Sequence, residues 1–574
     1  MTRSGKKFSV ILGIAFAGAV AILSFGMREF PLIMPELVKP EPLHVQVATS
    51  ITKQKWLNAA AQAFVAKGET STSGRPIVID VTGVLSGDSM LAILNGRLKP
   101  AAWSPGEENW VSELNDSLRK KAGQPAALAA CKPTVYAPLG IAIWRPMAEA
   151  LGWPDKKISW KMLIDLAGDP SGWSRYGHPE WGRLKLGYSH PQYSSAGLLF
   201  LATVVHAVIG KPGALDPKDV YAPEVDTALS KLAQNTTKYG LSSAELLNLM
   251  ARNGPQFLHA VSAFEQATVQ LNVERSKELR WPLVFIFPEE GTFWSDHPYC
   301  VLDGMPWITE EEADVARRFG EFLLEAGQQA IATRNYVRPI SAKALIDDPL
   351  TVANGTDPQA SPAKVPPLPI PGSAESKAII DSFLSTKRKA TVQIVLDTSG
   401  SMDGEAIRAA AEATRKFLGR LAPQDRVGLV TFNDAITAVA DIAPVSKVGE
   451  RLSRTVANLV AGGGTNLNGA ICDGIARLKV AQQQDAAAGE NRLYGMVLLS
   501  DGADTTGAIS EGRMFQTCLP SGPEAAGIRV FTVAFGKDAN SDVLRRVAQA
   551  SGGASFAADS QSIDETYLKI SAEQ

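Results

Sequence analysis

Four short apolar runs in the C-terminal third of the chain constrain its fold most. They are rich in valine, leucine, isoleucine and phenylalanine and show little polar alternation, as expected of strands buried on both faces. They lie at Val392–Leu396, Val427–Phe432, Tyr494–Ser500 and Arg529–Phe535. Amphipathic segments with helical spacing separate them, at Ile407–Leu421 and Leu467–Leu478. The alternation predicts a doubly wound α/β domain with a mostly parallel, Rossmann-like sheet and helices on both of its faces.

Oxygen-bearing side chains follow these strands in three separate loops. They are Asp397, Ser399, Ser401, Thr465 and Asp501. Because open sheets of this kind bind ligands beyond the carboxyl ends of their strands, we expect the five side chains to converge. Carboxylate and hydroxyl oxygens suit hard cations, with Mg²⁺ as first choice and Mn²⁺ or Ca²⁺ as alternatives. We expect Asp397 to lie at the rim of the domain, so that its removal leaves the fold intact.

Other interpretations of the same residues fit less well. An EF-hand loop starting at Asp397 requires glycine and glutamate where Met402 and Arg408 stand. The chain has no GxxxxGK[ST] loop for nucleotide phosphates. A metal-dependent hydrolase remains an alternative, although no histidine follows His297 to serve as a general base. A helix cap, in which Asp397 or Ser399 only satisfies backbone donors, also remains open.

With the DxSxS motif at 397–401, Thr465 and Asp501, the second domain resembles the von Willebrand factor A domain over about residues 389–574. These positions match the metal-ion-dependent adhesion site of that family. The resemblance implies a divalent cation that bridges the domain to an acidic side chain of a protein partner. It implies a binding protein and not an enzyme. Asp403, Asp434 and Asp504 match no ligand position of the family.

Serines recur at the starts of predicted elements in the first domain, residues 44–347. The candidates are Ser50, Ser86, Ser89, Ser104, Ser194 and Ser195. With the runs Trp103–Pro105, Ala137–Trp144 and His190–Gly197, they make this domain similar to bacterial extracellular solute-binding proteins. That resemblance implies a bilobed α/β fold closing on a small polar or anionic solute, which helix N-termini favour. Helix capping is the alternative role for each serine, and a transporter-associated component is the alternative function.

The extreme N-terminus carries an uncharged run from Phe8 to Met27, preceded by Arg3, Lys6 and Lys7. Twenty helical residues span about 30 Å, the thickness of a bilayer's apolar core. The positive flank predicts a single-pass anchor within residues 1–30, with the bulk of the chain outside the cytoplasm. A signal peptide cleaved near Ala19–Ala21 is the alternative. A net charge of −2 without a basic face argues against a nucleic-acid partner.

Composition divides the rest of the chain. All tryptophans precede residue 308, and seven prolines between residues 347 and 371 predict a semi-rigid linker over 348–386, before the second domain at 387–574. Hinge-like strands are expected near Pro133–Ala137 and Tyr299–Leu302. The four cysteines fall two per domain, so an oxidising compartment predicts the pairs Cys131–Cys300 and Cys472–Cys518. Buried free thiols are the alternative.

Overall fold

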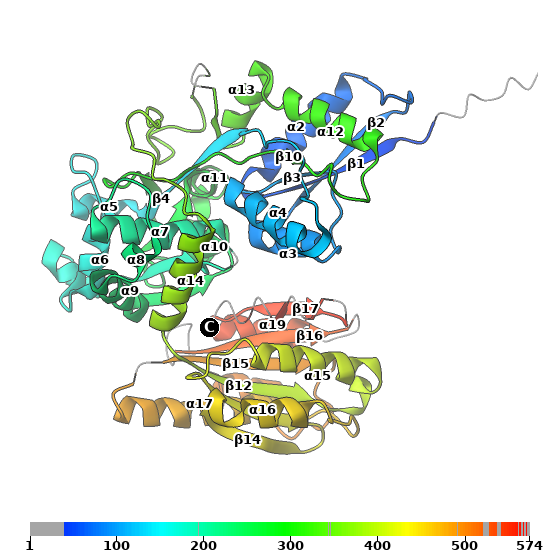
Figure 1. The fold of residues 1–574 in the computed structure, drawn as a ribbon. Coiled ribbons are helices and arrows are strands. Elements are labelled where there is room, and N and C mark those ends of the chain that lie inside the picture. The colour runs from blue at the N-terminus through cyan, green and yellow to red at the C-terminus, as the bar shows by residue number, and fades with distance from the viewer. Residues whose placement is uncertain are drawn as a thin grey trace, which may run out of the picture.

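The computed structural model describes residues 40–192, 194–341, 344, 346–490, 492–519, 527–536, 541–560, 562–563, 566–567 and 570. The predicted membrane anchor at residues 1–30 lies outside these ranges. Among the residues that are described, no helix is both long and apolar enough to span a bilayer. Figure 1 shows an N-terminal part with two lobes above a C-terminal α/β domain, which helix α14 (Ser373–Thr386) joins.

The first lobe contains a four-stranded sheet with the order β10-β3-β1-β2. Strands β1, β2 and β3 are parallel, and β10 is antiparallel to β3. The strands are β1 (Leu43–Thr49), β2 (Ile77–Gly83), β3 (Ala102–Ser104) and β10 (Cys300–Val301). The helices are η1 (Ile51–Lys53), α2 (Gln54–Ala66), α3 (Ser86–Leu94), α4 (Glu108–Ala122), α12 (Glu310–Phe322) and α13 (Ala326–Arg334). Apolar side chains such as Trp56 and Phe319 bury one face of this sheet, and Trp103 and Leu114 lie in a second core.

The second lobe contains a seven-stranded sheet centred on β4 (Val135–Trp144). The other strands are β5 (Leu186–Ser189), β6 (Thr236–Gly240), β7 (Ala260–Phe264), β8 (Leu283–Ile286), β9 (Trp294–Ser295) and β11 (Arg338–Pro339). The helices are α5 (Arg145–Leu151), α6 (Trp160–Gly168), η2 (Gly172–Tyr176), η3 (Pro179–Trp181), α7 (Ser195–Ile209), α8 (Pro217–Val220), α9 (Pro223–Asn235), α10 (Ser243–Asn253), α11 (Glu265–Glu274) and η4 (Ser276–Glu278). The expected bilobed α/β fold is confirmed.

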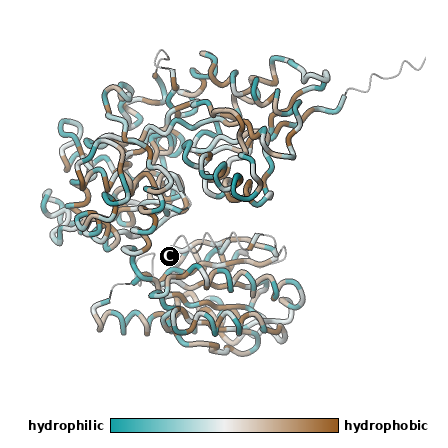
Figure 2. The backbone as a smooth tube through the Cα atoms, viewed as in Figure 1, coloured by the Kyte–Doolittle hydropathy of each residue, from teal (hydrophilic) through white to brown (hydrophobic). Residues whose placement is uncertain are grey.

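The C-terminal domain has a six-stranded sheet with the order β14-β13-β12-β15-β16-β17, in which only β14 is antiparallel to its neighbour. The strands are β12 (Ala390–Asp397), β13 (Arg426–Phe432), β14 (Ile436–Pro444), β15 (Leu493–Ser500), β16 (Ile528–Phe535) and β17 (Ser555–Ala558). The helices are η5 (Gly400–Met402), α15 (Glu405–Leu418), α16 (Val445–Val456), α17 (Leu467–Ala487), α18 (Glu511–Thr517) and α19 (Ser541–Ala550). Alternate residues of β12 enter two cores, Leu396 with Phe417 of α15 and Val395 with Ile471 of α17. The doubly wound prediction is confirmed, and Figure 2 shows apolar residues along the inner strands.

The segment expected as a linker packs against the second lobe. The backbone N–H of Phe285 donates to the carbonyl of Gly355, and Leu368 donates to Thr292. Helix α14 then contacts α7, α8 and α9, where Ile379 and Phe383 enter the core of this lobe. Proline-rich composition predicts the extended backbone, but the buried side chains of Leu368, Ile379 and Phe383 hold the segment in place.

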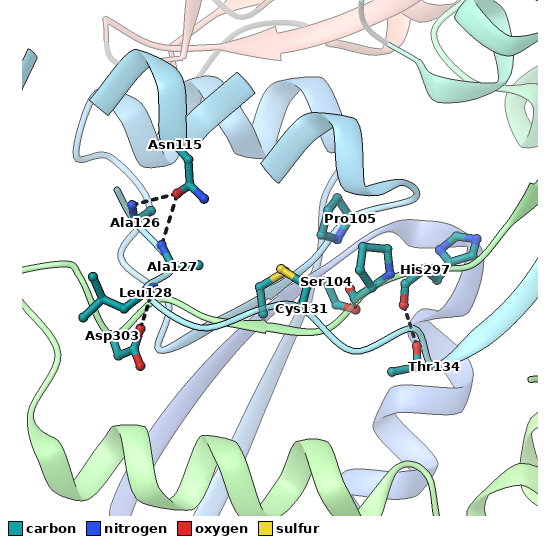
Figure 3. The surroundings of a disulfide bond; sticks show 12 residues. Ser104, Pro105, Asn115, Ala126, Ala127, Leu128, Cys131, Thr134, His297 and Asp303 are labelled. Atoms are coloured by element: carbon teal, nitrogen blue, oxygen red, sulfur yellow. Dashed lines mark hydrogen bonds between the residues drawn. A yellow bond between two sulfur atoms is a disulfide. The ribbon is translucent and has the colours of Figure 1, made fainter. Parts of the chain in front are cut away.

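Both predicted disulfides are present. Cys131–Cys300 joins two of the segments by which the chain crosses between the lobes, close to the expected hinge strands. Figure 3 shows its surroundings, where the Thr134 hydroxyl donates to the carbonyl of His297 at 2.6 Å. Cys472–Cys518 connects α17 to the residue after α18 across 46 positions. Closing a loop of that length stabilises a fold by about 4 kcal/mol in the chain-entropy model.

Candidate functional site

Three loops of the C-terminal domain meet beyond the carboxyl ends of β12, β13 and β15. The N–H of Gly400 donates to the carbonyl of Gly463 at 3.0 Å, and Thr398 donates to Phe432 at 2.8 Å. On the other side, Thr505 donates to the carbonyl of Thr465 at 2.9 Å. Backbone hydrogen bonds thus fix the loop after β12 between the loops that carry Thr465 and Asp501.

The side chains of these loops converge as the sequence predicts. Ser401 Oγ donates to Asp501 Oδ1 at 2.8 Å and lies 3.1 Å from Ser399 Oγ. The N–H of Ser399 donates to Asp397 Oδ1 at 2.8 Å. A methyl group placed on Gly502 would lie 3.8 Å from Thr465 Oγ1 and 3.9 Å from Ser401 Oγ, so both hydroxyls border one space. The structure therefore brings together all five predicted side chains.

The Thr465 hydroxyl is the most informative of these groups. Thr465 is 4% exposed, and its Oγ1 forms no hydrogen bond with the described residues. An oxygen kept unpaired at the edge of a carboxylate cluster fits a ligand for a hard cation.

Asp397 does not lie at the rim of the domain, which corrects the expectation from sequence. It is 0% exposed, because it is the last residue of a strand buried on both faces. Ser500 Oγ donates to its Oδ2 at 2.5 Å, a contact that the sequence analysis missed. Burial, and next the charge of Asp501, raise the pKa of Asp397. A cation would offset both effects.

The five-residue cluster contains few charged groups. Within the part of the chain that the structure describes, no three His, Cys, Asp or Glu side chains group in a way that could hold a metal. The five-residue cluster holds only two carboxylates, so any cation there depends on hydroxyl oxygens for its remaining ligands. Hydroxyl and carboxylate oxygens fit Mg²⁺, Mn²⁺ or Ca²⁺ and do not fit soft metals.

A second candidate site is a cavity of about 230 Å³ between the two N-terminal lobes. Four of the six predicted serines line it, Ser50 and Ser86 from the first lobe and Ser194 and Ser195 from the second. Trp110 Nε1 of the first lobe donates to Ser195 Oγ of the second at 2.8 Å. The cavity is therefore built from both lobes, as expected of a cleft that closes on a solute.

Ser89 and Ser104 do not line this cavity, contrary to expectation. Ser89 Oγ accepts a hydrogen bond from Trp103 Nε1 at 3.0 Å and donates to the carbonyl of Leu85. Ser104 Oγ donates to the carbonyl of Pro298 at 2.5 Å. Both hydroxyls stabilise the first lobe and its connection to the hinge.

Sequence reasoning missed Ser242 and Ser243, which line the same cavity as Gln266. Ser242 caps α10 by accepting from the N–H of Glu245, and this S-x-x-E spacing was the available signal. Ser243 is 5% exposed, and its hydroxyl has no hydrogen-bond partner among the described residues. Helices α3, α7, α10 and α11 all begin at the cavity, so their free N–H groups favour an anionic or polar ligand.

Two buried charges lie behind the cavity wall. Lys53 Nζ donates to the carbonyls of Ser104 and Pro105 at 2.9 and 3.0 Å, and burial lowers the pKa of Lys53 well below its ordinary value. Burial also raises the pKa of Glu107, whose Oε1 accepts from Ser295 Oγ at 2.7 Å. These contacts fix the loop that carries Gly106, a lining residue, against the hinge.

Curated relatives are similar to part of this chain. An uncharacterized protein of Synechocystis sp. is 32% identical over 162 residues, which are 28% of this chain and 35% of that protein. Inter-alpha-trypsin inhibitor heavy chain H4 of Sus scrofa is 28% identical over 162 residues, 28% of this chain and 17% of that protein. The chain thus spans about a third or less of the length of these curated relatives.

Among solved structures, the periplasmic binding protein AfuA from Actinobacillus pleuropneumoniae, with fructose-6-phosphate bound, is similar to 60% of this chain. The match covers 98% of that protein, at 16% identity and a TM-score of 0.41. The family model of the von Willebrand factor type A domain matches residues 392–568, the region of the six-stranded sheet and the five-residue cluster. This region of the chain is similar to von Willebrand factor type A domains.

Proposed function

We propose that this chain is an exported bacterial recognition protein, anchored in the cell membrane by a helix within residues 1–30. Its von Willebrand factor type A domain binds a protein partner through a divalent cation. Its N-terminal domain binds a small polar or anionic solute. The convergence of two carboxylates and three hydroxyls from three loops, with the Thr465 hydroxyl unpaired, is the observation that carries the proposal.

The residues of the cluster would supply two kinds of ligand to the cation. Asp397 and Asp501 supply the negative charge, while Ser399, Ser401 and Thr465 supply neutral oxygens. The cation supplies a Lewis acid that accepts one more oxygen ligand, from an acidic side chain of the partner. Binding rather than hydrolysis is favoured because no histidine follows His297 in the chain to act as a general base.

Calorimetric titration of the full chain with MgCl₂ tests the metal centre. We expect one site, and a thermal unfolding temperature that rises with Mg²⁺, because a cation held by the folded state alone stabilises it by about 2.7 kcal/mol at 100 times its Kd. MnCl₂ and CaCl₂ rank the cations, and NaCl at equal ionic strength is the control. Absence of binding heat with all three divalent cations would remove the proposal.

Thermal shift of the full chain with inorganic phosphate, sulfate and glucose tests the solute cavity. We expect at least one of these probes to raise the unfolding temperature, since the cavity offers hydroxyls and free helix N–H groups. Ser243→Ala should weaken that binding by about tenfold, the effect of one hydrogen bond to a charged group. The exposed Ser174→Ala is the matched control, and equal affinity in both variants would contradict the assignment of Ser243.

A further inference from the structure

The loops around the metal centre carry charge of one sign. Residues 397–404, 433–435, 457–466 and 501–510 contain five aspartates and no lysine or arginine. Two of these are the cluster residues Asp397 and Asp501. The other three are Asp403, Asp434 and Asp504, and Asp403 and Asp434 are exposed.

The carboxylate of Asp434, in the turn after β13, packs against the loop that carries Thr465. A Cβ on Gly463 or Gly464 would lie 2.3 or 2.5 Å from its carboxylate oxygens, so any other residue there would force the Asp434 side chain to shift. Gly463 also has a φ of +85°, a conformation that disfavours other residues. The glycines therefore make room for this carboxylate directly beside the metal centre.

Asp504 has a different role from the exposed pair. Its Oδ2 accepts from the N–H of Asn468 at 2.9 Å, and its Oδ1 accepts from Gly507 at 2.8 Å. These bonds hold the loop after β15 against the start of α17. Asp403 and Asp434 form no salt bridge with the described residues, so their charges face an incoming partner unneutralised.

A divalent cation leaves this face negative, since two positive charges meet five aspartates. A partner that brings a carboxylate to the cation adds a further negative charge. Like charges within a Debye length, about 8 Å at physiological ionic strength, still repel one another. Several such repulsions oppose a partner that has acidic or neutral residues around its metal-binding carboxylate. Lysine or arginine side chains beside that carboxylate would instead be attracted to the aspartates.

We propose that the partner carries its metal-binding carboxylate within a cluster of lysine and arginine side chains. This inference rests on the proposed function of the same centre. Thr465 is 4% exposed and its hydroxyl has no partner among the described residues, so it marks where the cation lies, and Asp403 and Asp434 determine the charge around it.

A random 12-residue peptide library displayed on phage and panned on the immobilised full chain in Mg²⁺ tests the inference. Bound phage are released with EDTA, so that only cation-dependent peptides are sequenced. We expect these peptides to carry Asp or Glu, with Lys or Arg within three residues of it at least about twice as often as in the starting library. The double variant Asp403→Asn/Asp434→Asn should still release peptides with EDTA, without the Lys and Arg enrichment.

The variant Asp155→Asn/Glu224→Gln is the matched control, since it removes two exposed charges from the N-terminal domain. It should keep the full enrichment. EDTA-released acidic peptides without neighbouring Lys or Arg would overturn the inference and leave the metal centre standing. An enrichment unchanged by Asp403→Asn/Asp434→Asn would also overturn it. A lack of any EDTA-released peptide, with no Mg²⁺ binding heat, would overturn the metal centre and the inference together.

Discussion

Asp397→Asn is expected to lower the Mg²⁺ affinity of the full chain by about 100-fold or more, which corresponds to roughly 2.7 kcal/mol. The substitution removes one of the two carboxylates of the cluster. Asparagine keeps an amide oxygen that accepts from the N–H of Ser399, so the loop after β12 retains its shape. Calorimetric titration of the variant beside the wild type measures the change.

Without the cation, the free energy of unfolding of Asp397→Asn should not be lower than that of the wild type. Burial raises the pKa of Asp397, which means that the folded state disfavours the ionised carboxylate. A neutral amide at the same position removes that cost at neutral pH. Asp441→Asn, on the edge strand β14, is the matched control and should bind Mg²⁺ as the wild type does. Equal affinity in Asp397→Asn and Asp441→Asn would refute the assignment of Asp397.

Arg338→Met is expected to destabilise the chain by about 3–5 kcal/mol, because it leaves one member of a buried ion pair alone. Arg338 and Glu265 are each 1% exposed, and two hydrogen bonds of 2.6 and 2.7 Å join them. Arg338 also donates to the carbonyls of Asp357 and Ala360, both at 2.6 Å. The substitution therefore also frees the segment that precedes α14.

Urea unfolding of three variants separates these contributions. Arg338→Met and Glu265→Met should each lower the midpoint strongly. The double variant should lie closer to the wild type than the sum of the two, since no unpaired charge is then buried. Strict additivity of the two single effects would show that the pair does not act as predicted.

Local periodicity was sufficient to predict four of the six strands in the sheet of the C-terminal domain. Strands such as Val392–Leu396 are buried on both faces, so their composition alone identifies them, and residues after such strands must meet at one edge. Strand β14 escaped prediction because it is an edge strand with mixed exposure, in which Thr437 and Ala438 are exposed. It pairs antiparallel with β13 across the short turn at residues 433–435, so that Phe432 lies opposite Ile436.

How deeply a site residue is buried, and which site residues lie together, depends on contacts between segments that are far apart in the sequence. Asp397 was expected at the rim, but its burial results from packing on both faces of β12. Ser89 and Ser104 resembled Ser86 in sequence, yet their hydroxyls bind Leu85 and Pro298. Whether a serine caps a helix, braces a hinge or lines a cavity is decided by its neighbours in space.

The docking of α14 fixes a geometry between the two candidate sites. Phe383 of this helix lies in the core of the second lobe. Arg388, at the start of the C-terminal domain, donates to the carbonyl of Arg492, directly before β15. Strand β12 then runs directly from this junction to Asp397, a distance of about 26 Å for eight extended residues. A partner bound at the candidate metal centre would therefore meet the N-terminal lobes at a set distance and orientation, without the loss of effective concentration that a flexible connection would bring.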